Sequence, residues 1–236
     1  MALKKNNSTL EVIKYLSMIS MIIDHVGAVL YHDCIGCREI GRFAYIGFAF
    51  LVAYNYKYRT NNKFNYKMRL LTWSIISQVP HYLAFGNFYH LNILFLLLIS
   101  LYSIDAIETL KEKYIYRFTF DPRSPEHDLT FLFHFFAVLV LALVAIVSFL
   151  TGYGVFGVLI IILFYYLEDF KKIFFPLLLI SIALVNMDLI YAAAAIISFS
   201  IIYMLHIDFK IKRLNKYLFY SFYPVHLMLL WFLTKL

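Results

Sequence analysis

The chain has 236 residues, of which 63% are hydrophobic and 15% are charged, and its mean hydropathy is +0.76. This excludes an ordinary soluble domain, in which about 45–50% of residues are apolar and about 25% are charged. The net charge of +7 does not indicate nucleic-acid binding, because the Lys and Arg residues lie in short segments between apolar runs and form no single basic stripe. We therefore expect an all-α polytopic integral membrane protein, with the lipid bilayer as a partner and one transmembrane domain over residues 1–236.

Apolar runs follow one another along almost the whole chain. A helix that crosses a hydrocarbon core of about 30 Å needs about 17–25 residues. On this basis the sequence predicts about nine transmembrane helices. They are expected at residues 12–31, 38–56, 68–85, 90–107, 130–149, 153–167, 173–186, 188–206 and 216–234. The sixth and seventh are short, which favours tilted helices or helices buried among their neighbours.

The basic residues predict the orientation, since Lys and Arg accumulate in cytoplasmic segments. With the N-terminus in the cytoplasm, most of the 21 Lys and Arg residues fall on the cytoplasmic side. An odd number of helices then places the C-terminus outside. The longest predicted loop, at about residues 108–129, is cytoplasmic in this topology.

The first predicted helix carries three ionisable residues, Lys14, Asp24 and His25. A charge near the bilayer centre costs at least about 2.5–3.5 kcal/mol, so these residues are functional candidates. Lys14 and His25 share one face, about three turns and about 16 Å apart. Asp24 points about 100° away from His25 around the helix. It can therefore partner either His25 or a group on another helix.

The second predicted helix opens with Arg38 and Arg42, which are four residues apart and share a face. Two guanidinium groups so placed suit a phosphate or a carboxylate. The alternatives are charges that extend outward to the membrane surface, or an ion pair with Asp24 that joins two helices. Cys34 and Cys37, the two cysteines of the chain, precede them and would form a small disulfide outside the cytosol.

The last predicted helix brings Tyr223 and His226 onto one face, and Pro224 interrupts the backbone hydrogen bonds in the same turn. This pattern favours a pocket wall, although a buried histidine bonded to a neighbouring helix would give the same pattern. Asn92 and Tyr153 fall in the outer half of the predicted topology and are further pocket candidates. We expect no metal, because His-x-x-x-His and paired C-x-x-C spacings are absent from the sequence.

Several blocks of the sequence resemble the TraX family, the F-pilin acetylases. The opening match runs from Lys14 to Gly27 and continues from Arg38 to Phe50. Four later blocks follow in the order of the family. They are Arg69-Leu-Leu with Ile76-Ser-Gln-Val-Pro80, then Leu91-Asn92-Ile-Leu-Phe95, then Gly152-Tyr-Gly-Val-Phe-Gly157, and finally the run from Lys216 to Leu227. Two positions depart from the family pattern: Tyr45-Ile46-Gly47 stands in place of Phe-Pro, and Gly152 in place of an acidic residue.

The resemblance implies a multi-pass acetyltransferase of the bacterial plasma membrane. Such an enzyme moves an acetyl group from cytoplasmic acetyl-CoA to an amine or hydroxyl of a pilin-like peptide, a glycan or a lipid. The Lys14 to His25 spacing is also similar to that of the acyltransferase-three superfamily, in which the histidine is catalytic and nearby arginines hold the donor. Histidine suits this role because it titrates near neutral pH and acts as a base or a nucleophile. The expected site is His25 and Asp24 for catalysis, Lys14, Arg38 and Arg42 for the donor, and Asn92, Tyr153, Tyr223 and His226 for the pocket.

Other functions are compatible with the same residues. In a proton-coupled small-molecule transporter, Asp24, His25 and Arg42 would form a proton relay, although the sequence shows no inverted repeat with broken helices in matching places. A metal-dependent hydrolase or a pilus-assembly scaffold has no motif of its own here. The acceptor and the oligomeric state are left open by the sequence.

Overall fold

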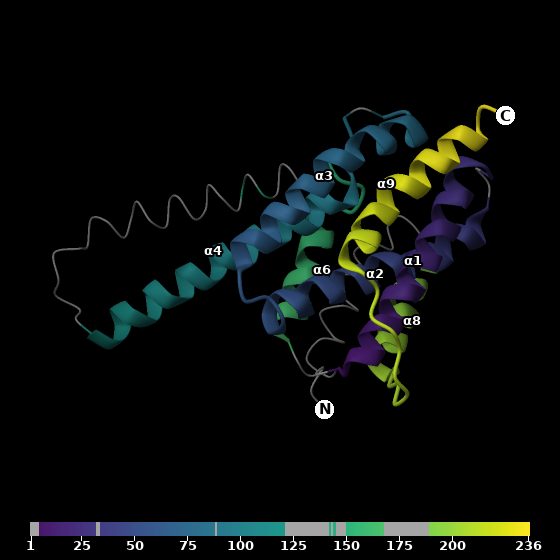
Figure 1. The fold of residues 1–236 in the computed structure, drawn as a ribbon. Coiled ribbons are helices and arrows are strands. Elements are labelled where there is room, and N and C mark those ends of the chain that lie inside the picture. Colours follow the sequence, from purple (N-terminus) through teal and green to yellow (C-terminus); the bar gives the residue numbers. More distant parts are fainter. Residues whose placement is uncertain are drawn as a thin grey trace.

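The described part of the chain folds almost entirely into α-helices, in agreement with the predicted fold class (Figure 1). The structure is a computed structural model that describes residues 5–31, 34–87, 89–120, 142, 144, 150–167 and 189–236. Its helices are α1 (Asn7–Val29), α2 (Ile35–Tyr58), α3 (Lys63–Phe85), α4 (Ile93–Phe120), α6 (Gly154–Tyr166), α8 (Leu189–Met204) and α9 (Lys216–Leu233). Within these ranges the one β-type pairing is an isolated parallel bridge between Leu91 and Thr151.

The observed helices coincide with seven of the predicted segments, while 130–149 and 173–186 lie almost wholly outside the described residues. The clearest difference is α4, which continues through the predicted loop as far as Phe120. Glu, Leu and Lys are strong helix formers, and an i,i+3 ion pair joins Glu108 to Lys111 at 3.7 Å. The polar segment therefore prolongs the helix beyond its apolar part.

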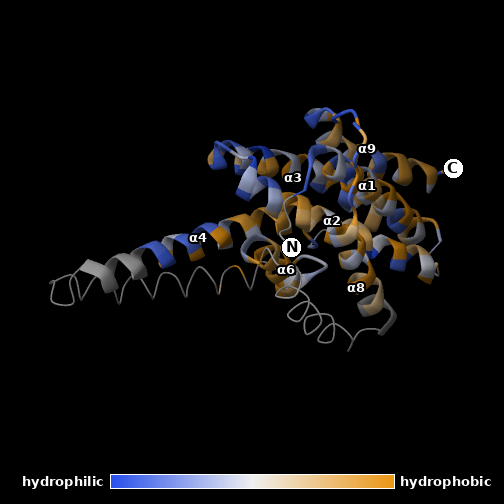
Figure 2. Ribbon diagram, turned by 90° about the horizontal axis from the view of Figure 1, so that it is seen from below, coloured by the Kyte–Doolittle hydropathy of each residue, from blue (hydrophilic) through white to orange (hydrophobic). Residues whose placement is uncertain are grey.

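Two of the described helices are long and apolar enough to cross a membrane, Asn7–Val29 and the Ile93–Glu112 part of α4. Figure 2 shows hydrophobic residues along α1, α2, α6 and α8, and hydrophilic residues in the part of α4 that projects from the bundle. Large apolar side chains are also exposed on several helices, and a surface of that kind suits contact with lipid. They include Ile19, Ile75, Val79, Ile197 and Leu229. Nine spans and the positions of the two termini stay predictions.

Helix α2 lies at the centre of the bundle and contacts α1, α4, α6 and α8. Its middle is fully buried, with Ala49, Ala53 and Tyr56 at 0% exposure. Small side chains at the first two of these positions allow neighbouring helices to approach closely. Helix α9 completes the group by packing against α3 and α1. Helices α1, α2, α3 and α9 therefore surround a common space.

Among the described helices, α1 and α2 make the most extensive contact, and glycine allows their backbones to approach each other closely. A Cβ atom at Gly41 would overlap the Asp24 side chain, and one at Gly47 would overlap Ser17. Because glycine carries no Cβ, α2 can pass directly over the polar side chains of α1. This contact brings Asp24 within reach of the first turns of α2.

At one end of the bundle α1, α3 and α9 begin and α2 and α8 end (Figure 1), and basic residues flank these helix ends in the sequence. Lys5 Nζ donates to the carbonyl oxygens of Tyr203 at 2.5 Å and Leu205 at 2.8 Å, and burial lowers the pKa of its ammonium group. We call this end the basic end and define it by Lys5, Arg59, Lys63, Arg213 and Lys216. Helix α9 ends at the opposite end of the bundle, where α1 also meets α2 (Figure 1).

Candidate active site

Two histidines from distant parts of the chain form a pair. Nδ1 of His25 on α1 lies 2.7 Å from Nε2 of His226 on α9, and the two ring planes are nearly parallel, with centroids 4.9 Å apart. The other ring nitrogen of His226, Nδ1, lies 2.8 Å from the carbonyl oxygen of Phe222. His226 therefore has polar partners on both ring nitrogens.

These contacts assign the protons of the neutral pair. A carbonyl oxygen only accepts, so Nδ1 of His226 carries the hydrogen and Nε2 of His226 is an acceptor. Nδ1 of His25 must then donate to His226, which leaves the lone pair of His25 on its Nε2 atom. In this tautomer His25 presents a basic and nucleophilic nitrogen, and His226 fixes its orientation.

Aromatic rings enclose the pair. Phe85 contacts the His25 ring edge-on at 5.3 Å, and Phe222 stacks on His226 at 5.0 Å. The Tyr223 ring lies 6.1 Å from His25 and 5.6 Å from His226. The His25 side chain is 12% exposed and His226 is buried, so electrostatic interactions with the pair are stronger than in bulk solvent.

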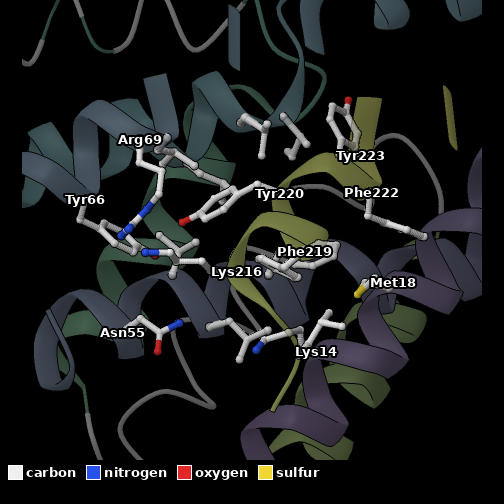
Figure 3. Close-up of a pocket in the computed structure, with 18 of the residues that line it drawn as sticks. Lys14, Met18, Asn55, Tyr66, Arg69, Lys216, Phe219, Tyr220, Phe222 and Tyr223 are labelled. Carbon is white, nitrogen blue, oxygen red and sulfur yellow. The ribbon is translucent and has the colours of Figure 1, made fainter. Parts of the chain in front are cut away.

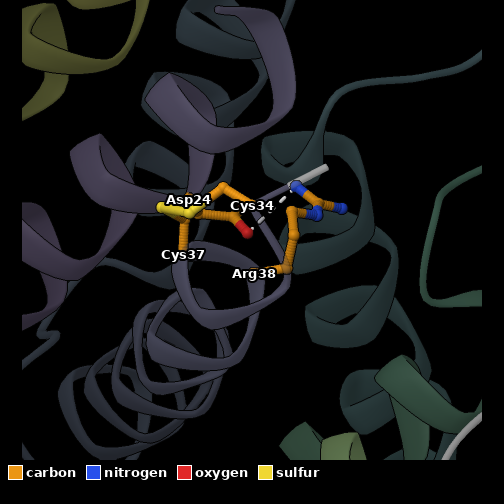
Figure 4. The surroundings of a disulfide bond; sticks show 4 residues. All are labelled: Asp24, Cys34, Cys37 and Arg38. Carbon is orange, nitrogen blue, oxygen red and sulfur yellow. Dashed lines mark ion pairs between the residues drawn. A yellow bond between two sulfur atoms is a disulfide. The ribbon is translucent and has the colours of Figure 1, made fainter. Parts of the chain in front are cut away.

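Asp24 connects the histidine pair to α2. Its Oδ1 atom forms an ion pair with Nη1 of Arg38 at 2.9 Å (Figure 4). Its Oδ2 atom lies 4.0 Å from Nε2 of His25. Cys34 and Cys37 form a disulfide bond next to this ion pair. The carboxylate thus faces both candidates that the sequence left open, with the direct ion pair going to Arg38.

Arg42 lies one turn further along α2, with its guanidinium 5.8 Å above the centre of the Tyr153 ring. Tyr153 stacks on Tyr45 at 3.9 Å, and the Tyr45 hydroxyl donates to the Gly157 carbonyl at 2.6 Å. Arg42 and Tyr153 therefore belong to the contact between α2 and the start of α6. A donor-binding role for the two arginines stays a prediction.

A cavity of about 250 Å³ lies between α1, α2, α3, α4 and α9 (Figure 3). Met21 and Tyr223 line the part nearest the histidine pair, whereas Arg59, Arg213 and Lys216 line the part at the basic end. Polar and aromatic side chains line the rest of the cavity near the basic end, and apolar side chains line its middle. Those residues include Glu11, Lys14, Phe48, Leu51, Tyr66, Arg69, Leu97, Phe219 and Tyr220. The cavity thus leads from the basic end toward His25.

The structure brings together only some of the expected site residues. His25, Tyr223 and His226 meet, and Lys14 lines the cavity, with its Nζ 2.8 and 2.9 Å from the two Glu11 carboxylate oxygens. Asn92 instead links α3 to α4.

The Asn92 amide donates to the Ser74 carbonyl and to Gln78, each at 2.8 Å, and its oxygen accepts from the Leu94 amide at 3.1 Å. Its side chain is completely buried. These bonds use both its donor group and its acceptor, so Asn92 has a structural role here.

Two cavity residues, Glu11 and Arg69, were not among the expected site residues. Glu11 is 2% exposed and holds Lys14, and Arg69 packs against the rings of Tyr66 at 5.6 Å and Tyr220 at 5.7 Å. The contact between Arg69 and Tyr66 could have been predicted from the sequence, because residues three positions apart share a helix face.

The profile of the TraX protein family matches residues 9–234 of this chain. The chain belongs to the TraX family. This confirms the resemblance seen in the separate sequence blocks, and the match includes every site residue described above. Membership in TraX and the two helices of membrane length together indicate a membrane protein.

An uncharacterized protein of Rickettsia prowazekii (strain Madrid E) is 33% identical to this TraX member over 108 residues. That alignment covers 46% of this chain and 37% of the relative, so the chain spans little more than a third of the relative's length. No solved structure matches the chain.

Proposed function

We propose that this TraX family member is a membrane acetyltransferase that uses acetyl-CoA. The acceptor would be an amine or hydroxyl of a pilin-like peptide, a glycan or a lipid. The observation that supports the proposal best is the His25–His226 pair beside a cavity that leads from the basic end, because Tyr223 lines that cavity and its ring is 6.1 Å from the His25 ring. The pair supplies a base, and the cavity supplies a route for the donor.

In the proposed reaction, His25 Nε2 removes a proton from the acceptor while the acceptor's lone pair attacks the thioester carbonyl carbon. The tetrahedral intermediate collapses by breaking the carbon–sulfur bond, and the CoA sulfur leaves with the proton from His25. The positive charge on His25 in between faces Asp24 Oδ2 at 4.0 Å. His226 keeps Nδ1 of His25 occupied, so that Nε2 is the atom that exchanges the proton.

The proposal includes a multi-pass topology in the bacterial plasma membrane. The N-terminus and the basic end would face the cytoplasm, where CoA is found, and the C-terminus would lie outside. The basic residues that flank the helix ends at the basic end support this orientation. The Cys34–Cys37 disulfide near the opposite end supports it too, because disulfides persist in oxidising compartments.

The proposal is tested by mass spectrometry of membrane and secreted fractions from cells with and without the gene. We expect a peptide, glycan or lipid that carries one additional acetyl group only when the gene is present. A His25→Ala gene should behave like the deletion, and a wild-type gene returned to the deletion strain should restore the modification.

The proton-coupled transporter is the alternative that this comparison must separate from an acetyltransferase. Identical acetylation in all strains, with proton-coupled solute uptake by the reconstituted wild-type protein, would overturn the proposal in favour of the transporter. Transfer from acetyl-CoA by the purified full chain in lipid nanodiscs would exclude an indirect effect in cells.

A further inference from the structure

The cavity described above has a gradient of charge. Five Lys or Arg side chains line it, against the single carboxylate of Glu11. Between its ends the walls are mainly apolar, with Phe48, Leu97 and Phe219 among them. The far end is bounded by Tyr223, whose ring is 6.1 Å from His25. A ligand that matches these walls has a strongly anionic head, a neutral arm and a reactive tail.

Lys14 and Arg59 already have hydrogen-bond partners within the fold. Lys14 is held by both oxygens of Glu11, at 2.8 and 2.9 Å. Arg59 donates to the Asn7 side chain. These contacts reduce the capacity of Lys14 and Arg59 to bind an additional anion.

Arg69 is the strongest candidate for an anion ligand. Its guanidinium lies 5.6 Å from the centre of the Tyr66 ring and 5.7 Å from that of the Tyr220 ring. Its Nε atom is buried and has no acceptor within the described part of the chain. A buried donor without a partner is costly, and an oxygen of a ligand in the cavity would satisfy it. Guanidinium is also the group that binds phosphate through two parallel hydrogen bonds.

Lys216 and Arg213 extend this anion site to the surface. Both side chains are exposed and line the cavity. Lys216 is also the first residue of α9, where the positive end of the helix dipole adds to its charge. Anions from water can therefore reach the basic end directly.

We infer that this cavity binds the acyl donor, with the phosphates of its nucleotide at Arg69 and Lys216 and its thioester beside His25. The inference rests on the proposed function and moves the donor phosphates away from Arg38 and Arg42. Arg38 is paired with Asp24 at 2.9 Å, and neither arginine lines the cavity. The ligand class is a nucleotide-bearing thioester whose neutral arm crosses the apolar middle of the cavity.

The test measures equilibrium binding to the full-length protein in lipid nanodiscs by isothermal titration calorimetry. The probes are CoA, dephospho-CoA, which lacks one phosphate, and pantetheine, which lacks them all. Arg69→Gln should weaken CoA binding about tenfold or more, because it removes hydrogen bonds from a charged group. Lys216→Gln should weaken it less, and pantetheine binding should change in neither variant. Added salt should weaken the binding of CoA but not that of pantetheine.

Lys235→Gln is the control, because Lys235 is an exposed lysine beyond the end of α9, away from the basic end, and does not line the cavity. It should leave CoA affinity unchanged. Where Arg69→Gln does not fold, Arg69→Lys keeps the charge and should still weaken CoA binding, since an ammonium lacks the guanidinium fork. Unchanged CoA affinity in folded Arg69 and Lys216 variants, or its loss in Arg38→Gln alone, would overturn the inference.

The two proposals fail differently. Suppose that acetyl transfer depends on His25 but CoA affinity is unchanged in the Arg69 and Lys216 variants. The proposed donor site would then be wrong, and the proposed acetyltransferase activity would stand. CoA binding that requires Arg69, combined with no acetyl transfer to any acceptor, would keep the donor site and remove the acetyltransferase.

Discussion

His25 and His226 are 201 positions apart in the chain, yet Nδ1 of the first lies 2.7 Å from Nε2 of the second. The contact joins the first helix of the fold to the last. Because the Phe222 carbonyl holds the other nitrogen of His226, the direction of the hydrogen bond between the histidines follows. The reactive lone pair of His25 then points away from His226.

Loss of the proposed base should remove turnover and leave donor binding nearly intact. His25→Ala should lower the rate of acetyl transfer by about 10²–10⁴-fold, because general base catalysis contributes that much to rate and little to ground-state affinity. His226→Ala should cost less, since His25 keeps its own Nε2. The measurement is CoA thiol release by purified variants, with the exposed His206→Ala as the control. More than about a tenth of wild-type turnover in His25→Ala would contradict the assignment.

The Asp24–Arg38 ion pair should contribute to stability. Their charged groups are 2.9 Å apart with side chains 17% and 35% exposed, so a coupling energy of about 1–3 kcal/mol is expected. Thermal unfolding of Asp24→Asn, Arg38→Gln and the double variant in detergent measures it as a double-mutant cycle. The double variant should lose less unfolding free energy than the sum of the losses in the two single variants. A coupling near zero would mean that the pair contributes nothing.

The close contact of α1 with α2 should not tolerate a methyl group at Gly41. Gly41→Ala places a Cβ against Asp24, so we expect a loss of about 1–3 kcal/mol of stability, as in other overpacked sites. Gly36→Ala is the matched control on the same helix, because nothing lies within 4 Å of its Cβ position. It should leave the unfolding temperature unchanged or raise it slightly. Equal behaviour of the two variants would contradict the close packing.

The topology is open to a labelling experiment in intact cells. A tag at residue 62, in the turn before α3, should be inaccessible from outside, and a tag after Leu236 should be accessible. Cys34 and Cys37 should react with an impermeant maleimide only after the cells are treated with a reductant. Accessibility of both tags from the same side would contradict the predicted odd number of spans.

Much of the local structure could be predicted from the amino-acid sequence. Apolar runs specify which segments become helices, because a helix satisfies its own backbone hydrogen bonds and the runs have the length that a membrane requires. Helix periodicity likewise placed Lys14 and His25 on one face of α1. The order of short motifs was sufficient to recognise the TraX family, which the profile match over residues 9–234 confirms.

The tertiary structure alone decided which of these faces meet. Periodicity puts Arg38 and Arg42 on one helix face, but it does not show whether that face meets Asp24, a phosphate or the membrane surface. Arg38 pairs with Asp24 because α2 approaches α1 closely. Gly41 permits this approach because it has no Cβ atom to overlap the Asp24 side chain. The pairing of His25 with His226 and the cavity beside Arg69 likewise require helices distant in sequence to be packed together. Such contacts depend on the summed packing of many side chains, which no local pattern encodes.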